Sequence, residues 1–317
     1  MENEKKEIAL IISGGIGKEL CATTLIKWLK EKGYDKIITL SGYPEVFNNN
    51  PHVYRNLHMN TSYLEDDYLK GIDIRQGEVY QMIEYREGRR HLNQLMPIAY
   101  RFGDEENSNI FPEIYPSKHE IMEVKKIISS AKTPIVTVQF QGGPIMMDAS
   151  GQPISGNSAR DLTQKQAQLV VDTLTKNNFS VLQIRAGNQF ICQNTQVLNL
   201  HPRMYMILSK FTAGHIGIDS FMNHVAACWK KPALIFWNQT KFQNLGYPTA
   251  TNINRDACPI PMCNRPRVGY GDIIPGGIWN CPYGKVCQKW TDDEVIKSVD
   301  EFCRGLRNEE KTKTLHK

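Results

Sequence analysis

The strongest constraint on the fold is a series of strand, glycine-rich turn, helix and strand that begins twice. The first series opens with the apolar run at residues 7–13, passes through GGIGK at 14–18 and a helical pattern, and reaches KIITL at 36–40. The second opens with PIVTVQF at 134–140. Consecutive parallel strands need such a helical crossover. The pattern therefore predicts an α/β protein with two parallel sheets covered by helices.

Length supports two domains rather than one. The chain has 317 residues, and a single core usually stops growing at about 250–300 residues. We place the boundary near residues 128–133, which gives an N-terminal domain over 1–130 and a C-terminal domain over 131–317. Two capping boxes are expected, Thr163 with Gln166 and Thr291 with Glu294, and they predict a helix after residue 163 and a C-terminal helix. Both domains are expected to be doubly wound and Rossmann-like.

Composition is that of a soluble globular protein and excludes few functions. The chain is 41% hydrophobic and 22% charged, with a formal net charge of +5. It lacks the roughly 20 consecutive apolar residues of a membrane-spanning helix. The charged start, MENEKKEIALIIS, fits neither a secretory signal nor a transit peptide. We therefore expect a cytoplasmic protein. The mild positive charge suits an anionic ligand, a glycolipid, a membrane surface or nucleic acid without choosing among them.

The first candidate site is the glycine turn at the start of the chain. In open α/β sheets, ligands bind beyond the carboxyl ends of the strands, where helices begin. Gly14, Gly15 and Gly17 would let the backbone approach a ligand closely. The spacing is neither that of a phosphate-binding P-loop nor that of a dinucleotide fingerprint. A tight strand-to-helix turn without a ligand remains the alternative.

The second candidate site lies in the stretch HIGIDSFMNH at residues 215–224. Asp219 and Ser220 stand where a helix should begin, and His224 follows one turn later. Free amides and a partial positive charge at a helix start attract phosphate groups. The alternative is that the acid and the hydroxyl only cap the helix. His224 would then be a hydrogen-bonded core histidine.

A resemblance to a known family covers nearly the whole chain. GIDSFMNHVAACWKKPALIFWNQT, at residues 217–240, resembles the motif D-[ST]-G-x-x-H-x-A-A-x-x-x-K-P-x-x-x-x-x-G-x-T of the family 9 glycosyltransferases, the heptosyltransferase group. The segments at 14–42, 48–57 and 258–295 are also similar to that family. The resemblance implies a GT-B fold, in which two Rossmann-like domains face each other across a cleft. It further implies a nucleotide-sugar donor in the second domain, an acceptor in the first, and transfer with inversion and without a metal.

The resemblance also implies a set of donor-binding residues. These are Gln141, Gly142, Asp219, Ser220, Phe221, Met222 and His224. Arg160 lies near a position where the family often has a lysine. A cation there would stabilise the charge that develops on the leaving diphosphate, which makes Arg160 a candidate catalytic residue. Its alternative is a solvated loop arginine.

Two departures from the family pattern affect the catalytic assignment. The family normally has an aspartate directly after the glycine turn, as the base on the acceptor hydroxyl, whereas this chain has Lys18 there. Glu19, one residue later, is the candidate substitute, so Lys18 and Glu19 join Arg160 as catalytic candidates. Phe221 also replaces the family's usual glycine. Donor binding is therefore better supported than the identity of the base.

The acceptor side is expected in the tyrosine- and arginine-rich segment at residues 79–102. The acceptor-binding candidates are Gly15, Gly17, Arg86, Arg89, Arg90 and His91. Arginines beside aromatic rings suit a phosphorylated or acidic sugar, and they also suit nucleic acid. The alternative is a solvated helix face with tyrosines packed at its edge.

Four cysteines crowd into a loop at residues 254–290. Cys258, Cys263, Cys281 and Cys287 have the spacing C-x4-C-x17-C-x5-C. Four thiolates can hold a structural zinc ion tetrahedrally, although the spacing is looser than a C-x2-C pair. A reducing cytoplasm disfavours disulfides. We expect a structural zinc here as one alternative, and no cofactor for catalysis.

These observations lead to an expected enzyme activity with several alternatives. We expect an inverting glycosyltransferase that moves a sugar from a nucleotide-diphosphate donor to a hydroxyl of a glycan or glycolipid. One alternative is glycosylation of a hydroxymethylated DNA base by the same fold, with a phage origin. Another is a nucleotide-sugar-binding protein that has lost catalysis. A sugar-nucleotide epimerase, which shares the two-domain architecture, is the third.

Overall fold

The chain forms two compact units. The computed structural model describes residues 6–60, 69–143, 145–147, 153–155, 160–238, 240–255, 283–284 and 286–315. The units are Met1–Glu123 and Val124–Lys317. The division falls inside α5 (Lys118–Ile128), just before the boundary predicted at residues 128–133.

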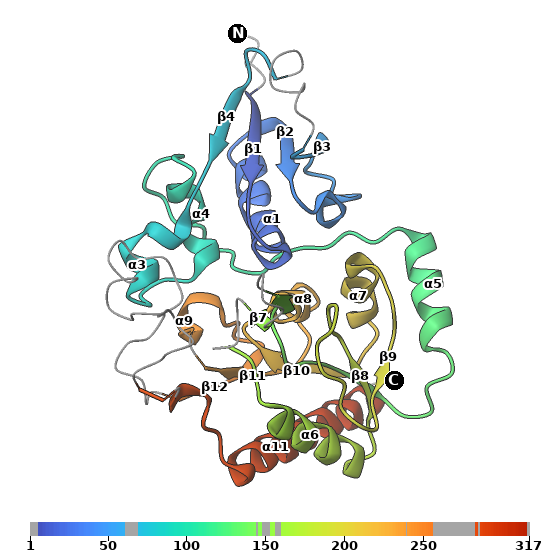
Figure 1. Ribbon diagram of the computed structural model, residues 1–317. Helices are drawn as coiled ribbons and strands as arrows, with labels where there is room; N and C mark the ends of the chain where they lie inside the picture. Colours follow the sequence, from blue (N-terminus) through green and yellow to red (C-terminus); the bar gives the residue numbers. More distant parts are fainter. Residues whose placement is uncertain are drawn as a thin grey trace. The chain divides into compact units, whose positions relative to one another are not determined.

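Unit 1 is built on a four-stranded, fully parallel sheet in the order β3-β2-β1-β4 (Figure 1). Its elements are β1 (Lys6–Ile12), α1 (Ile16–Glu31), β2 (Tyr34–Ser41), η1 (Pro44–Phe47), β3 (Arg55–His58), β4 (Asp73–Gln76), η2 (Val79–Gln81), α3 (Ile83–Arg86) and α4 (Leu92–Ala99). The predicted series of strand, turn, helix and strand at residues 7–40 is confirmed. The chain runs outward from β1 to β3, then returns to place β4 on the other side of β1.

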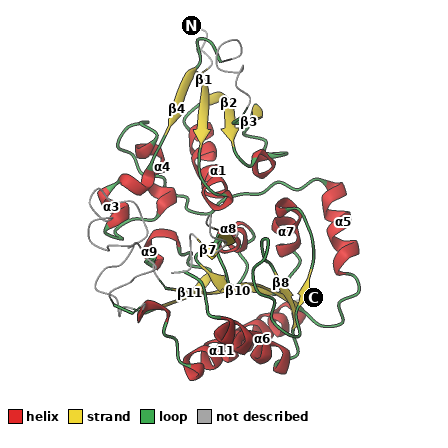
Figure 2. Cartoon of the chain, in the orientation of Figure 1, coloured by secondary structure: helices red, strands yellow, loops and turns green. Residues whose placement is uncertain are grey.

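Unit 2 contains a six-stranded parallel sheet in the order β12-β11-β10-β5-β8-β9 and a small antiparallel pair, β6-β7. Its elements are β5 (Ile135–Gln139), β6 (Ile145–Met147), β7 (Pro153–Ser155), α6 (Gln164–Lys176), β8 (Ser180–Gln183), β9 (Gln196–Val197), α7 (Pro202–Ser209), β10 (Gly214–Ile218), α8 (Phe221–Cys228), β11 (Ala233–Trp237), α9 (Phe242–Leu245), β12 (Ala250–Asn254), η4 (Val286–Gln288) and α11 (Asp292–Leu315). Helices α6 and α11 cover one face of the sheet, and α7 and α8 cover the other (Figures 1 and 2). This unit is doubly wound, as the sequence predicts.

Apolar strands and two capping boxes account for the packing of unit 2. The strands β5, β10 and β11 contribute fully buried side chains to one core, together with Ala167, Val170 and Val171 of α6. The Thr163 hydroxyl accepts a hydrogen bond from the Gln166 amide, and the Gln166 side-chain oxygen accepts one from the Thr163 amide. The expected boxes at Thr163 and Thr291 both form. Reciprocal capping satisfies amides that a helix start otherwise leaves without partners.

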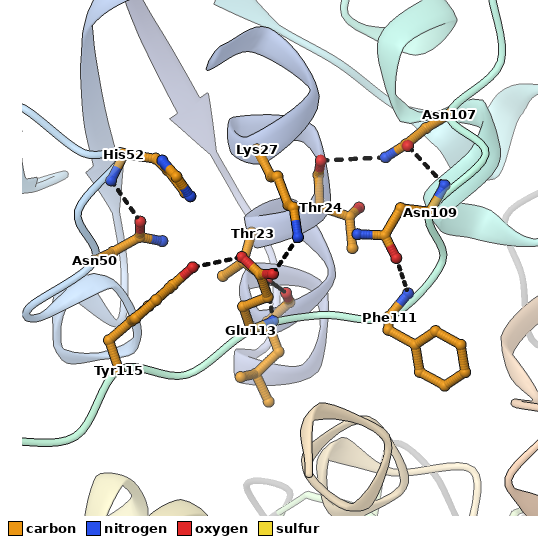
Figure 3. A network of polar contacts seen from close by, with 11 residues as sticks. Thr23, Thr24, Lys27, Asn50, His52, Asn107, Asn109, Phe111, Glu113 and Tyr115 are labelled. Atoms are coloured by element: carbon orange, nitrogen blue, oxygen red, sulfur yellow. Dashed lines mark hydrogen bonds and ion pairs between the residues drawn. The ribbon is translucent and has the colours of Figure 1, made fainter. Parts of the chain in front are cut away.

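A strap at residues 107–115 runs along α1 in unit 1 (Figure 3). The Asn107 side chain donates to the Thr24 carbonyl, at 3.1 Å, and the Glu113 amide donates to the Thr23 hydroxyl, at 2.9 Å. Lys27 and the Tyr115 hydroxyl each donate to the Glu113 carboxylate, at 2.6 Å. The strap is therefore fixed to the helix by hydrogen bonds and an ion pair rather than by regular secondary structure.

Among the described residues, no helix combines the length and apolar character needed to cross a membrane. The longest, α11, carries three acidic residues in its first turn.

Candidate active site

Each sheet has one position where the strand order reverses. In unit 2 the chain passes from β5 to β8 and β9 on one side, then to β10 on the other side of β5. In unit 1 it passes from β1 to β2 and β3, then to β4 on the other side of β1. A crevice opens beyond the carboxyl ends of parallel strands at such switch points, and ligands bind there in open α/β sheets. The start of α8 lies at the first of these places, and the glycine turn before α1 lies at the second.

The start of α8 lies at the switch point of unit 2. Ser220 is its N-cap residue by backbone conformation, but no side chain caps this helix. The Ser220 hydroxyl instead donates to the Gln139 side chain at the end of β5. The capping alternative for this hydroxyl therefore fails. A helix start leaves its first amides without intrahelical carbonyl partners, and in α8 these are the amides that precede Asn223.

Asp219 connects the start of α8 to a cation. The residue is 3% exposed, and its carboxylate accepts a 2.5 Å hydrogen bond from Thr240. Arg160 donates from Nη1 to the Asp219 carbonyl at 2.9 Å and lies 3.3 Å from the carboxylate. The Arg160 side chain is 15% exposed, so it is not the solvated loop arginine of the alternative reading. Asp219 acts here by holding Arg160 beside the helix start.

Asn238 and Asp161 hold the chain on either side of this arginine. The Asn238 side chain donates to the carbonyls of Arg160 and Asp161, at 2.8 and 3.1 Å. The Asp161 carboxylate accepts the Gly142 amide at 2.8 Å. Burial raises the pKa of Asp161 to about 6, against the lowering effects of that amide and of Arg160. The cation is thus placed by a buried framework from three strand ends.

Two predicted donor-binding residues have partners inside the protein. The Gly142 amide is used by Asp161, and the Gln141 side chain accepts the Phe190 amide at 3.0 Å. Both residues thus have a structural role, and their predicted donor contacts stay a prediction.

The remaining candidates of α8 are mostly buried. Met222 is 0% exposed, whereas Phe221 is half-buried. His224 is 4% exposed, and its Nδ1 lies 2.7 Å from the Tyr247 hydroxyl. This matches the reading of His224 as a hydrogen-bonded core histidine. Met222 can offer a ligand only its backbone amide.

In unit 1 the switch point brings together Lys18 and Glu78. Gly14 and Gly15 are exposed at the turn after β1, and Gly17 is half-buried. The Lys18 side chain is 3% exposed, and its ammonium lies 3.4 Å from the Glu78 carboxylate and 5.3 Å from the centre of the Tyr80 ring. Lys18 is therefore turned inward, while the turn itself is open.

Glu19 is 0% exposed. Its carboxylate accepts the amides of Gly42 and Tyr43, at 2.9 to 3.1 Å, and so ties the chain after β2 to α1. Burial raises the pKa of Glu19 to about 7, which is the range of a general base. The geometry nevertheless gives Glu19 a positioning role, because a base must reach the proton that it removes. This corrects its assignment as the substitute base.

The predicted acceptor arginines pair with nearby acids or carbonyls. Arg89 forms an ion pair with Glu87, and Arg90 lies 2.9 Å from Glu106. Both arginines are exposed. Their pairs contribute little to stability, because water screens surface charges, so either arginine could exchange its partner for an anionic ligand. Arg86 is half-buried and lies 3.5 Å from the Tyr80 carbonyl.

His91 has a structural role instead of the predicted acceptor contact. It is 5% exposed and is the N-cap residue of α4, where its ring accepts the Asn93 amide at 3.2 Å. Gln94 completes the capping box by accepting the His91 amide. A ring fixed beneath the helix start cannot turn to an acceptor without breaking this cap.

Most of the cysteine cluster lies outside the described residues. This holds for Cys258, Cys263 and Cys281, while Cys287 is buried in η4. No group of metal-ligating side chains occurs within the described ranges. The zinc site stays a prediction.

Sequence reasoning missed Thr240 and Glu78. Thr240 is the last threonine of the quoted family motif, so its signal was present in the sequence. The sequence contained no such signal for Glu78, because β4 has no clear periodicity and the contact between Lys18 and Glu78 joins positions 60 residues apart.

The structure is similar to solved glycosyltransferases, although no family model and no curated protein matches the sequence. A family 9 glycosyl transferase from Veillonella parvula DSM 2008 shares 12% identity at a TM-score of 0.68, over 96% of this chain and 99% of that one. The E. coli ADP-heptose lipopolysaccharide heptosyltransferase II shares 12% identity at a TM-score of 0.65, again over 96% of this chain and 99% of that one. The dodecameric iron-containing heptosyltransferase TibC, in complex with ADP-D-beta-D-heptose, shares 11% identity at a TM-score of 0.65. The match covers 96% of this chain and 78% of that chain.

The fold is that of the family 9 glycosyltransferases. It consists of two Rossmann-like units of the GT-B type, as the resemblance in sequence implied. At 11–12% identity the likeness establishes the fold. The residues at the two switch points are what bears on activity.

Proposed function

We propose that this protein is a glycosyltransferase that uses a nucleotide-diphosphate sugar as donor. The observation that carries the proposal is the placement of Arg160 beside the open start of α8, held by Asp219 at the switch point of unit 2. A guanidinium and a helix start together form a site for a diphosphate. The same fold occurs in proteins described as heptosyltransferases.

The proposed chemistry is a single displacement at the anomeric carbon. An acceptor hydroxyl loses its proton and attacks that carbon, while the bond to the diphosphate oxygen breaks and its electron pair leaves with the diphosphate. Attack opposite the leaving group inverts the anomeric centre. Arg160 and the α8 amides would act on the leaving oxygen, where negative charge grows in the transition state. A cleft between the units, which would bring donor and acceptor together, stays a prediction.

The donor is proposed to be an ADP-sugar, because a similar structure contains ADP-D-beta-D-heptose. The acceptor is proposed to be a hydroxyl of a glycan or glycolipid. A hydroxymethylated DNA base is the alternative. An acceptor screen with lipopolysaccharide cores, simple glycans and hydroxymethylated DNA separates these classes.

Donor binding is the first test. We expect one member of a panel of ADP-glucose, ADP-heptose, UDP-glucose and GDP-mannose to raise the melting temperature at millimolar concentration, by mass action on the folded state. In Arg160→Gln the affinity for that donor should fall about tenfold or more, because hydrogen bonds to charged groups contribute about 1.5–3 kcal/mol.

Lys165→Gln is the matched control. Lys165 is also a cation of unit 2, but it is exposed and pairs with Asp292 at 2.7 Å. Its replacement should leave donor affinity unchanged. A panel in which no sugar nucleotide stabilises the protein would refute the proposal.

A second candidate function is nucleotide-sugar binding without catalysis. It is favoured by Lys18 and Glu19, since neither offers an exposed carboxylate after the glycine turn. Mass spectrometry of the donor after long incubation distinguishes the two. Transfer or hydrolysis supports the enzyme, whereas an intact donor on a protein that binds it supports the binding protein.

A further inference from the structure

We propose that Glu78 is the base that removes the proton from the attacking hydroxyl. The proposal rests on the glycosyltransferase function proposed above. In this reading, the carboxylate that the family carries directly after the glycine turn is supplied here by the end of β4. Lys18 then holds that carboxylate in place.

Glu78 lies where the acceptor side of the reaction is expected. It follows β4, and Lys18 follows β1, so the two residues flank the switch point of unit 1. The sheet keeps the two strand ends together, because Ile11 of β1 is the register partner of Gln76 of β4. Glu78 thus stands beside the glycine turn at the ligand-binding edge of the sheet.

Gly77 explains how the chain reaches this place. A Cβ at this position would lie 2.2 Å from the Tyr100 ring, so only glycine lets the backbone pass over that buried side chain. Tyr100 is in turn anchored by a 3.2 Å hydrogen bond to the Ile11 carbonyl. Glu78 is therefore placed by packed groups rather than by a free loop.

The carboxylate of Glu78 is oriented and still accessible. Its Oε2 lies 3.4 Å from the Lys18 ammonium, and its Oε1 accepts the Tyr80 amide at 3.1 Å. The side chain is nevertheless 47% exposed, against 3% for that of Lys18. A general base needs this combination of fixed direction and reach to the substrate.

The other groups at this edge are less suited to the role. Glu19 is buried, and both of its oxygens accept backbone amides. The Lys18 ammonium has donors but no acceptor. Gly14 covers the lysine stem, since a Cβ there would lie 3.0 Å from Lys18 Cδ. Of these three charged side chains, Glu78 alone combines an acceptor oxygen with a side chain that solvent reaches.

The proton balance of the step is simple. The hydroxyl proton moves to a Glu78 oxygen as the hydroxyl oxygen bonds to the anomeric carbon. The bond from that carbon to the diphosphate breaks, and the nucleoside diphosphate leaves with its electron pair. Glu78 then returns the proton to water. No metal or redox partner is needed for this balance.

The test uses the full chain and the sugar nucleotide that stabilises it, with water as the acceptor and nucleoside diphosphate release as the readout. In Glu78→Gln, kcat should fall about 100-fold or more, since general base catalysis contributes about 10²–10⁴-fold. The donor affinity should stay unchanged, because the donor site lies in unit 2. The melting temperature should fall by only a few degrees, because the Lys18 ammonium loses its charged partner while the unit stays folded. The Glu78→Asp variant should retain part of the rate.

Glu105→Gln is the matched control. Glu105 also pairs with a lysine, since it lies 2.6 Å from Lys32, but this pair is exposed and Lys32 is the C-cap residue at the other end of α1. The control should keep the wild-type kcat. A kcat within threefold of wild type in folded Glu78→Gln would overturn the proposal for Glu78 while leaving the glycosyltransferase function in place. No release by the wild-type protein with any donor would overturn both.

Lys18 is tested as a positioning residue. Lys18→Met should lower kcat about tenfold with little change in the KM for donor, and Lys18→Arg should restore most of the loss, since either cation can hold Glu78. Lys18→Asp combined with Glu78→Gln returns the carboxylate to the helix start. If this double variant recovers nucleoside diphosphate release, the result would support a carboxylate base that can stand at either position. Equal kcat in Lys18→Met and wild type would contradict the positioning role of Lys18.

Discussion

Each unit has a buried acid with a raised pKa beneath the candidate ligand edge, and these two acids, Glu19 and Asp161, differ in their surroundings. Glu19 in unit 1 is 0% exposed and accepts the amides of Gly42 and Tyr43. Asp161 in unit 2 is 8% exposed and accepts the Gly142 amide, with Arg160 next in sequence. Both acids fasten the chain that follows a strand.

The difference between them is the neighbouring cation. Burial raises the pKa of Glu19 to about 7, and only hydrogen bonds oppose it, while Glu45 adds to the rise. Burial raises the pKa of Asp161 to about 6, and Arg160 is among the groups that oppose the rise. A raised pKa is often taken as a mark of catalysis. Here it marks structural acids in both units, and the exposed carboxylate of Glu78 is the better candidate for proton transfer.

The largest expected effect is on stability as a function of pH. For both acids the folded state holds its proton to higher pH than the unfolded state. Each therefore lowers the free energy of unfolding as pH rises through its window, by up to about 3 kcal/mol at 1.36 kcal/mol per pKa unit. The windows are about pH 4.5–7 for Glu19 and about pH 4–6 for Asp161.

Glu19→Gln and Asp161→Asn test this difference. Between pH 6 and pH 7, the free energy of unfolding of wild type should fall as pH rises. This fall should be smaller in Glu19→Gln and unchanged in Asp161→Asn. Denaturation at stepped pH gives the free energies, and hydrogen exchange assigns them to a unit. If the free energy of unfolding of both variants depended on pH in the same way above pH 6, the proposed difference between Glu19 and Asp161 would be wrong.

A smaller effect is expected for a half-buried acid that has a cation of its own. Glu113 in the strap accepts from Lys27 and from the Tyr115 hydroxyl, both at 2.6 Å (Figure 3). Near neutral pH, Glu113→Gln should lower the free energy of unfolding by about 1 kcal/mol, because a partly exposed ammonium loses its charged partner. Glu19→Gln should act in the opposite direction under the same conditions.

A double-mutant cycle with Lys27→Met isolates the ion pair. We expect a coupling of about 0.2–1 kcal/mol, since both side chains are partly exposed. Coupling of zero would mean that the strap is held by the Thr23 and Thr24 contacts instead. Thr23→Val would then lower the free energy of unfolding more than Lys27→Met does.

The sequence predicts those features that depend on local order. The strands at residues 7–13 and 134–140 are continuous apolar runs, and the Thr163 box joins residues three apart. Asp219 was named as a site residue because helix starts after buried strands mark the ligand edge. Arg160 was named because the family resemblance implies a cation near that position. Their pairing across 59 positions follows from the switch between β5 and β10, which no local pattern encodes.

The errors come from contacts that local order does not contain. Glu19 was chosen as a base for its place in sequence, but the chain after β2 folds back and encloses it. His91 was grouped with neighbouring arginines, whereas it caps α4, a position that serine, threonine, aspartate and asparagine more often fill. Lys18 could not be interpreted without Glu78. Each correction depends on a long-range contact or an uncommon cap.

The smallest expected effect concerns the chain after β2, which encloses the Glu19 carboxyl. A Cβ at Gly42 would lie 3.5 Å from Glu19 Oε1, which is an ordinary van der Waals contact. Gly42→Ala should therefore change the free energy of unfolding by no more than about 0.5 kcal/mol. The added methyl should extend the pH window of Glu19 slightly upward, because it removes more water from the carboxyl. In Glu19→Gln the same substitution should have no effect on the pH dependence, and a pH effect there would show that another group titrates in this window.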